Sequence, residues 1–338
     1  MSEAFSHGPG SARTLVTGAS GFVGSALVER LARDGASVRA AARRRQDADT
    51  HSAGPIDHVV VPDLSATTDW SAALDGIDVV VHCAARAHML RDDAADPLAS
   101  FRAVNVDGTA RLARAAAAAG VRRFVFVSSI GVNGSQTFGR PFTAEDLPAP
   151  QTPYARSKLE AEQVLSAIAS ETGMAVTVVR PPLVYGPHAP GNFSTLVRAV
   201  RRGLPLPLAS VRNRRSFIGR SNLVDLLARC SSHPLAAGLT LLASDGEDLS
   251  TPELVRRIAR ALRVPPRLLP VPPSWLLHAA RIAGRPALGQ QLCGSLQIDS
   301  SLANQRLGWS PPSSVDEELG EMARAGSAGA NRPAASTA

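Results

Sequence analysis

The sequence predicts an α/β fold in which a doubly wound parallel sheet is followed by a smaller mixed α/β domain. In the first half of the 338-residue chain, short β-branched runs alternate with longer Ala/Leu-rich stretches, the pattern of repeated strand–helix–strand units. The expected strands are almost unbroken apolar runs, as in a sheet that helices cover on both faces. After residue 180, clustered prolines interrupt this alternation and predict a second domain.

The elements of the first domain follow from these runs. Because crossovers between parallel strands are right-handed, the elements predict a Rossmann-type sheet. We expect this domain to span 12–180 and the second 181–325, with 217–242 as a segment that could return to the first. The ends, 1–11 and 326–338, are expected to be disordered tails. Strands are predicted at 14–17, 37–41, 58–61, 78–82, 124–127 and 176–179, and helices at 22–33, 98–118 and 154–171.

Composition supports a globular protein and narrows its partners. Apolar residues make up 44% of the chain and charged residues 19%, which is enough for a sizeable core. The net charge of +7 favours anionic partners such as nucleotides, although few aromatic residues and no reader motif argue against nucleic acid. Cys83, Cys230 and Cys293 form no C-x-x-C pair, which disfavours disulfides and metal sites. Without a signal peptide or an apolar run of about 20 residues, we expect a cytoplasmic protein with no stable membrane insertion.

Three glycines follow the first expected strand, in the string T-G-A-S-G-F-V-G. Such spacing places one glycine at a tight turn, one where backbone approaches a pyrophosphate and one against the sheet, while the next helix points its free N–H groups at the phosphates. A plain Gly-rich turn is the alternative, but the strand before and the helix after favour a dinucleotide. The expected contacts are Gly18, Ser20, Gly21, Phe22, Val23 and Gly24.

The end of the second strand bears on which dinucleotide binds, NAD or NADP. An acid there favours NAD, whereas an arginine accommodates a 2′-phosphate. Here the strand ends in Arg43 and Arg44 with no acid, so we favour NADP and assign Arg43 to the cofactor site. The alternative is that Arg43 and Arg44 form a solvated basic turn and have no role in binding the cofactor.

Residues after the third and fourth strands complete the expected cofactor site. Asp63 could bind the adenine amino group and Leu64 could cover the ring, although Asp63 could instead cap a helix. Ala84 and Ala85 are small enough to let a cofactor lie close to the backbone. Cys83 is interpreted as a wall residue, because no basic partner is placed beside it by the sequence.

A serine, a tyrosine and a lysine form the expected catalytic group. The chain has one lysine, Lys158, and it lies four residues after Tyr154, so the two side chains share a helix face. A phenol that acts as a base near neutral pH needs its pKa lowered by about 3 units, or about 4 kcal/mol, which an ammonium and a positively charged nicotinamide could supply. Ser129, at the end of the fifth strand, could bind the substrate oxygen.

These motifs resemble those of the extended short-chain dehydrogenase/reductases, in the epimerase/dehydratase branch typified by UDP-glucose 4-epimerase. The resemblance covers about 13–319 and rests on the glycine loop, Asp63-Leu64, N-V-D-G-T, Ser128-Ser129 and Y-A-R-S-K. It implies that Tyr154 is the general base and that Lys158 holds the nicotinamide ribose and tunes the phenol. Asn105, in N-V-D-G-T, is implied to support the active site beside the cofactor.

The second half resembles the family's substrate domain more weakly. Asn192 and Arg215 match positions that contact the nucleotide diphosphate, and an arginine fork suits phosphate. Two departures are that Ser216 and Asn222 stand where the family usually has Asp. The late arginine of the family has no counterpart in 292–296.

The resemblance predicts an NAD(P)-dependent C4 oxidoreductase of a nucleotide sugar, first of all a 4-epimerase of a UDP-hexose or UDP-N-acetylhexosamine, and a homodimer through 98–118 and 154–171. The alternative is a 4-ketoreductase of a UDP-4-keto-6-deoxy-N-acetylhexosamine in surface-polysaccharide synthesis. Steroid- or flavonoid-type reductases share the catalytic residues. A non-catalytic dinucleotide-sensing regulator would be expected to lose the tyrosine or the lysine. Dehydration is disfavoured, because no acid pair follows Ser129.

Overall fold

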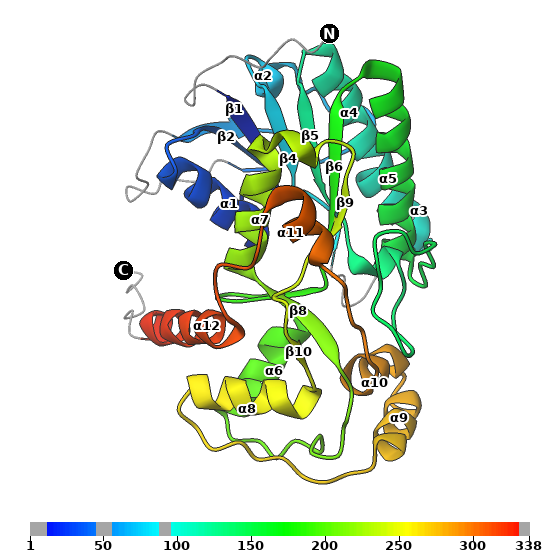
Figure 1. The fold of residues 1–338 in the computed structure, drawn as a ribbon, viewed down its shortest axis with the longest axis vertical. Helices are drawn as coiled ribbons and strands as arrows, with labels where there is room; N and C mark the ends of the chain where they lie inside the picture. Colours follow the sequence, from blue (N-terminus) through cyan, green and yellow to red (C-terminus); the bar gives the residue numbers. More distant parts are fainter. Residues whose placement is uncertain (1–11, 45–55, 88–95, 331–338) are drawn as a thin grey trace, which may run out of the picture.

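A parallel sheet of seven strands forms the larger part of the computed structural model, which describes residues 12–44, 56–87 and 96–330 (Figure 1). The strand order is β3-β2-β1-β4-β5-β6-β9, so the chain winds outward from β1 in both directions. This arrangement confirms the predicted doubly wound fold. The strands are β1 (Arg13–Thr17), β2 (Ser37–Ala42), β3 (Ile56–Val60), β4 (Val79–His82), β5 (Arg123–Val127), β6 (Ala175–Arg180) and β9 (Thr240–Leu242).

Helices cover both faces of this sheet, as the apolar strands require. On one face α1 (Phe22–Arg33) packs against α7 (Arg220–Ser232), and α11 (Ser301–Leu307) joins the same apolar core. The other face carries α2 (Ser71–Leu74), α4 (Thr109–Ala118) and α5 (Pro153–Thr172). Strand β4 is buried along its whole length between these layers, which explains its unbroken apolar sequence.

The helix predicted at 98–118 is interrupted, which corrects that prediction. The chain forms α3 (Pro97–Arg102), then a π-helical segment (Ala103–Gly108), then α4. In the π segment, Asn105 is buried and binds the backbone of Arg86 and the Ser157 hydroxyl. Periodicity could not reveal the extra residue per turn, because it is set by these tertiary contacts.

The smaller part of the molecule is a mixed sheet with helices around it. Its strands β7 (Leu183–Tyr185) and β8 (Arg215–Gly219) are parallel, and β10 (Asp248–Leu249) is antiparallel to β8. Three short helical turns, 130–132, 234–236 and the π segment, complete the secondary structure of the described residues. The helices of this part are α6 (Gly191–Arg201), α8 (Thr251–Ala261), α9 (Pro273–Ile282), α10 (Pro286–Cys293) and α12 (Val315–Ala330).

The chain returns twice from the smaller part to the large sheet. Strand β9 pairs with β6, and α11 then packs near β9 and contributes Ala303 and Leu307 to the core. The first return, β9, lies within 217–242, the segment that was predicted as a possible return. The second, α11, lies inside 181–325, the range predicted for the second domain. Helix α12 continues to Ala330, so 326–330 is helical rather than a disordered tail; its alanines favour helix. The predicted tails 1–11 and 331–338 lie outside the described residues.

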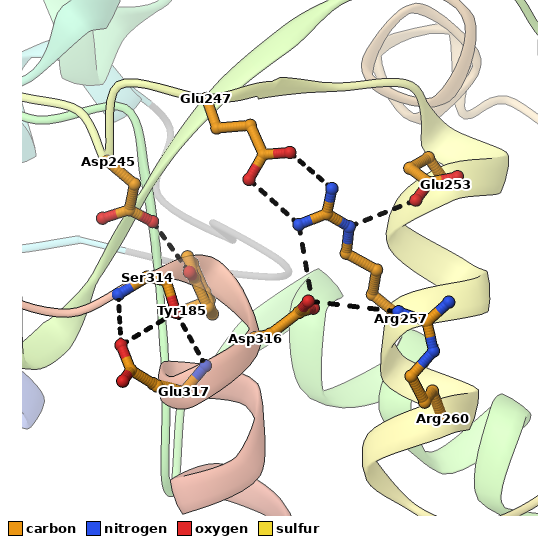
Figure 2. A network of polar contacts seen from close by, with 9 residues as sticks. All are labelled: Tyr185, Asp245, Glu247, Glu253, Arg257, Arg260, Ser314, Asp316 and Glu317. Carbon is orange, nitrogen blue, oxygen red and sulfur yellow. Dashed lines mark hydrogen bonds and ion pairs between the residues drawn. The ribbon is translucent and has the colours of Figure 1, made fainter.

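Helix α12 is attached to α8 by a network of charged groups (Figure 2). Arg257 on α8 binds Glu247 and Glu253 and lies 3.7 Å from the Asp316 carboxylate at the start of α12. Nearby, the Tyr185 hydroxyl donates to Asp245 at 2.7 Å. These contacts join three segments that are distant in sequence, around Tyr185, residues 245–257 and Asp316.

In the described part of the chain, every helix is too short or too polar to span a membrane.

Candidate active site

A cavity of about 640 Å³ lies where the two parts of the molecule meet. Its volume falls in the range of small-molecule sites, which is about 300–1,000 Å³. The large sheet contributes the carboxyl ends of β1, β4 and β5, where ligands of doubly wound folds bind. The predicted site residues that line it are Gly18, Gly21, Phe22, Val23, Gly24, Ser129, Tyr154, Asn192 and Arg215.

The glycine loop has the close approaches that its spacing predicts. Gly18 has a φ of +67°, and a Cβ there would lie 2.8 Å from the Ala84 nitrogen. A Cβ on Gly24 would lie 2.2 Å from the Gly18 oxygen, so only glycine lets α1 start this close to β1. Helix α1 has no side-chain cap and no acid in its first turn. Its first N–H groups therefore face the cavity ready for an anion.

The residues predicted to hold the adenosine lie outside this cavity. Arg43 and Asp63 follow β2 and β3 and pair with each other at 3.5 Å, with side chains 79% and 87% exposed. Leu64 packs against the π segment, where a Cβ on Gly108 would lie 2.6 Å from its Cγ. Arg44 is exposed. Ser20 is exposed in the glycine loop, while Arg43 and Asp63 follow β2 and β3, the two strands on one side of β1.

The end of β4 is close to the glycine loop. Ala84 and Ala85 are half-buried there, and the Ala84 N–H donates to the Thr17 hydroxyl. Cys83 lines the cavity, and burial raises the pKa of its thiol to about 12. A thiol that stays protonated is a poor nucleophile, which supports its interpretation as a wall residue.

Tyr154 and Lys158 lie on one face of α5 beside the cavity. Helix α5 begins at a Thr152 cap followed by Pro153, which fixes its first turn and the position of Tyr154. The Tyr154 ring reaches the cavity and meets Phe101 edge-on. Lys158 lies one turn deeper, where Nζ donates to the Val127 carbonyl at 2.9 Å and lies 4.5 Å from the centre of the Phe126 ring. The predicted helix face is thus present.

Burial shifts the pKa of both side chains in the direction that favours the neutral form of each. It raises the pKa of Tyr154 to about 12 and lowers the pKa of Lys158 to about 8. The lysine remains mainly protonated at neutral pH, which keeps a positive charge one helical turn from Tyr154. The protein environment alone does not lower the pKa of Tyr154, so a base at this position needs a further positive charge beside its ring.

Buried polar groups hold β5 and α5 together behind these residues. Ser129 accepts from the Gly131 N–H at 3.1 Å and lines the cavity. The neighbouring Ser128 donates to Glu162, which also binds Arg180 through two hydrogen bonds. Asn105 lies outside the cavity and binds Ser157 at 3.0 Å on α5. Its position in the structure is that of a supporting residue behind the cavity wall.

The smaller part of the molecule supplies a cation and a helix end to the same cavity. Arg215 on β8 is half-buried, and burial lowers its pKa to about 10. It donates to the Gly294 carbonyl at 2.9 Å and makes no ion pair among the described residues. Asn192 lies in the first turn of α6 and donates to Gln291 at 2.7 Å. A cation without a carboxylate partner, next to a helix start, is a binding environment for an anion.

Sequence reasoning missed several residues of the wall. Gln151 and Thr152, just before α5, line the cavity, and so do Leu288, Gln291 and Leu292 of α10. The cap signal T-P before Tyr154 could have identified Thr152. The α10 residues carry no comparable signal, because they meet the cavity only through contacts across about a hundred positions, as between Asn192 and Gln291.

Two acids stand near the positions where the family resemblance led us to expect aspartates. Ser216 donates to Asp248, and Asn222 donates to Asp245, each through its side chain. The carboxylates thus come from the loop after β9, which carries Asp245, and from β10, which carries Asp248, rather than from β8 and α7. This is a local rearrangement around the two departures from the family pattern.

Known proteins match this chain over most of its length. UDP-glucose 4-epimerase of Vibrio cholerae is 43% identical over 316 residues, 92% of this chain and 94% of that protein. UDP-glucose 4-epimerase of Mycolicibacterium smegmatis is 29% identical, over 91% of this chain and 96% of that protein. The solved structure of MoeE5 in complex with UDP-glucose and NAD has a TM-score of 0.76 and 27% identity, covering 95% of this chain and 100% of that one.

The family assignment rests on sequence and fold together. Residues 14–238 match the NAD dependent epimerase/dehydratase family, a span that contains the glycine loop, helix α5 and Arg215. Together with the doubly wound sheet and the relatives above, this match confirms the resemblance stated from the motifs. The chain belongs to the NAD-dependent epimerase/dehydratase family of enzymes.

Proposed function

We propose that this protein is a 4-epimerase of UDP-hexoses or UDP-N-acetylhexosamines. The observation that carries the proposal is the shared cavity, to which different parts of the molecule contribute Tyr154, one helical turn from Lys158, and Arg215, a cation with no acidic partner among the described residues. A nucleotide sugar has matching chemistry, because it joins a reactive hydroxyl to a diphosphate. The relatives named UDP-glucose 4-epimerase support the UDP nucleotide.

The residues then take separate roles in the reaction. When bound, an oxidised nicotinamide dinucleotide supplies the hydride acceptor and a positive ring charge beside the phenol. Tyr154 takes the proton of the C4 hydroxyl. It returns this proton after the 4-keto sugar has turned its opposite face toward the hydride donor. Ser129 holds the C4 oxygen, and Lys158, held by the Val127 carbonyl, keeps its positive charge one helical turn from the phenol. Arg215 and Asn192 hold the diphosphate at the start of α6.

An incubation without added dinucleotide tests the proposal. An epimerase returns the hydride that it takes and so works with the dinucleotide it retains. Purified protein given UDP-glucose or UDP-N-acetylglucosamine should form the C4 epimer, measured by chromatography or NMR. If no epimer forms but a UDP-4-keto-6-deoxy-N-acetylhexosamine oxidises added NAD(P)H, the protein is a 4-ketoreductase instead.

We also propose that the dinucleotide site accepts NADP(H) at least as well as NAD(H). No carboxylate ends β2, and the exposed pair between Arg43 and Asp63 contributes little free energy, so Arg43 is available to a 2′-phosphate. Titrating both dinucleotides into wild type and Arg43→Ala is the test. The variant should lose affinity for NADP(H) and keep its affinity for NAD(H). A clear wild-type preference for NAD, as bound in the MoeE5 complex, would contradict this.

A homodimer through α4 and α5 is part of the same proposal. These helices pack side by side on the outside of the large sheet (Figure 1). Their exposed surface includes small side chains such as Ala118 and Ala167, which allow close helix packing. Light scattering at micromolar concentration should give about twice the chain mass of 35.3 kDa. A cytoplasmic location stays a prediction from the sequence.

A further inference from the structure

Helix α9 has an apolar face that no other described part of the protein covers. None of its ten residues is buried, and Trp275 and Ile282 are 71% and 78% exposed. These two residues are seven positions apart, or about two turns, so they share one face, with the exposed His278 and Ala279 between them. The opposite face packs on α10, where a Cβ on Gly289 would lie 2.8 Å from Ala280 and 3.4 Å from Leu277. The outer face is therefore free of a structural role in the hairpin.

The segment of the chain that contains this face carries positive charge only. Between Glu253 and Asp299 the chain has seven arginines and no acidic residue. Arg281 and Arg285, at the end of α9 and just after it, are exposed and make no ion pair among the described residues. Long arginine side chains beside an apolar face can keep their charge at a polar boundary while their stems lie along the apolar groups.

The connection that leads into α9 extends the same character. Arg263 and Arg267 are exposed, and Leu269 is 48% exposed. Leu268 forms a bridge to Leu206, which holds this connection against the smaller part of the molecule. In Figure 1 it runs along the lower edge to α9, at the end farthest from the large sheet. A surface that approaches from this end meets exposed apolar groups and arginines that pair with no acid in the described part of the chain.

We propose that the outer face of α9, made of Trp275 and Ile282 and flanked by Arg281 and Arg285, docks reversibly on a membrane rich in anionic phospholipid. An apolar face with tryptophan and flanking arginines is typical of helices that lie in the interface between water and lipid. The arginines of this segment favour a membrane over a protein partner. A flat anionic surface complements a segment that has arginines and no acids, whereas the core of a protein interface is depleted of charged residues. The face is short, so binding is weak and depends on salt.

Vesicle binding tests the proposal without any use of catalysis. Full-length protein should co-sediment with phosphatidylglycerol–phosphatidylcholine vesicles at low salt, less at 0.5 M salt, and not with phosphatidylcholine alone. Trp70 and Trp309 are buried, at 3% and 5% exposed, so a blue shift of tryptophan fluorescence on the vesicles reports on Trp275. Equal binding to both kinds of vesicle, or no blue shift, would overturn the proposal.

Two double variants separate the apolar and the charged contributions. Trp275→Ser/Ile282→Ser should abolish sedimentation, and Arg281→Ser/Arg285→Ser should lower the partition constant about 20-fold or more, since each arginine contributes about fivefold at an anionic surface. Phe138→Ser, a change at an 84% exposed aromatic elsewhere, and Arg33→Ser/Arg306→Ser are the matched controls and should bind as wild type. If the α9 variant instead converts an oligomer to a smaller species while wild type ignores vesicles, the face is a protein interface and the proposal is wrong.

Discussion

Tyr154 and Lys158 are one helical turn apart, but their surroundings differ. The phenol lies at the cavity, and its hydroxyl makes no hydrogen bond to another described residue, whereas the ammonium is buried on the Val127 carbonyl. Removal of the Tyr154 hydroxyl alone therefore removes the proton-transfer group and keeps the contact of the ring with Phe101.

We expect Tyr154→Phe to fold and bind dinucleotide like wild type but to lose about 100-fold or more in turnover, the scale of general acid–base catalysis. Turnover of UDP-glucose with retained thermal stability is the measurement. Tyr185→Phe is the control: Tyr185 is buried and donates to Asp245, away from the cavity, so it should keep most of its turnover. Full activity of Tyr154→Phe would remove the phenol from the mechanism.

Arg215 offers a second test of a single side chain. Its charge lacks a carboxylate partner among the described residues, so a diphosphate would form its main ionic contact. Arg215→Ala should weaken UDP-sugar binding by about 2 kcal/mol, the value of a charge-assisted hydrogen bond, while dinucleotide affinity stays unchanged. Calorimetric titration of UDP and of NAD distinguishes the two. An equal loss for both ligands would place Arg215 outside the diphosphate site.

At the scale of elements, β6 and α5 are joined by a buried ion pair. Arg180 and Glu162 are 7% and 8% exposed, and Arg180 also donates to Asn133 at 2.9 Å. A buried pair is costly to break, because the remaining charge has no partner and no water. This pair lies directly behind Ser128 and so supports the strand end that carries Ser129.

Arg180→Met should destabilise the protein by about 3–5 kcal/mol, because it leaves the Glu162 carboxylate buried without its cation. Urea unfolding gives the free energy. The double variant Glu162→Leu/Arg180→Met removes both charges and should recover much of the loss. A double variant no more stable than Arg180→Met would show that packing, rather than the unpaired charge, dominates.

The helices and strands also show which parts of the structure a sequence can predict. The first six strands of the large sheet were predicted to within two residues, because most of them are short apolar runs between turn residues. The glycine loop and the Tyr154–Lys158 helix face are local patterns and were predicted correctly as structure. The π segment was missed because Asn105 sets it through Ser157, 52 positions away. The α10 wall and the Arg215–Gly294 bond likewise depend on contacts that no local pattern encodes.

At the scale of the whole molecule, α12 joins parts that the chain order separates. Its Glu318 is fully buried, both carboxylate oxygens lack a hydrogen-bond partner among the described residues, and the side chain lies against Gly219 at the start of α7. Burial raises the pKa of Glu318 to about 7, and Asp245 nearby adds to the shift. The folded protein therefore holds a proton here that the unfolded chain releases near pH 4.5.

This proton gives stability a defined dependence on pH. Between about pH 4.5 and 7 the folded state binds more protons than the unfolded state, so stability falls as pH rises through that window. Glu318→Gln should raise Tm relative to wild type at pH 7.5, and the difference should shrink toward pH 5. Calorimetry across pH measures both. A constant difference at all pH values would show that titration of Glu318 does not contribute.

The late position of β9 in the chain has a consequence for biosynthesis. During translation the first six strands are complete once Arg180 has left the ribosome, but the edge of β6 has no neighbour until Thr240–Leu242 emerges. Until then the nascent chain exposes a buried strand of the finished enzyme as an open edge, which invites pairing with other chains. A fragment that ends between these points would be prone to aggregation. In a fragment that includes β9, β6 is paired on both sides and only the three-residue strand β9 lies at this edge of the sheet.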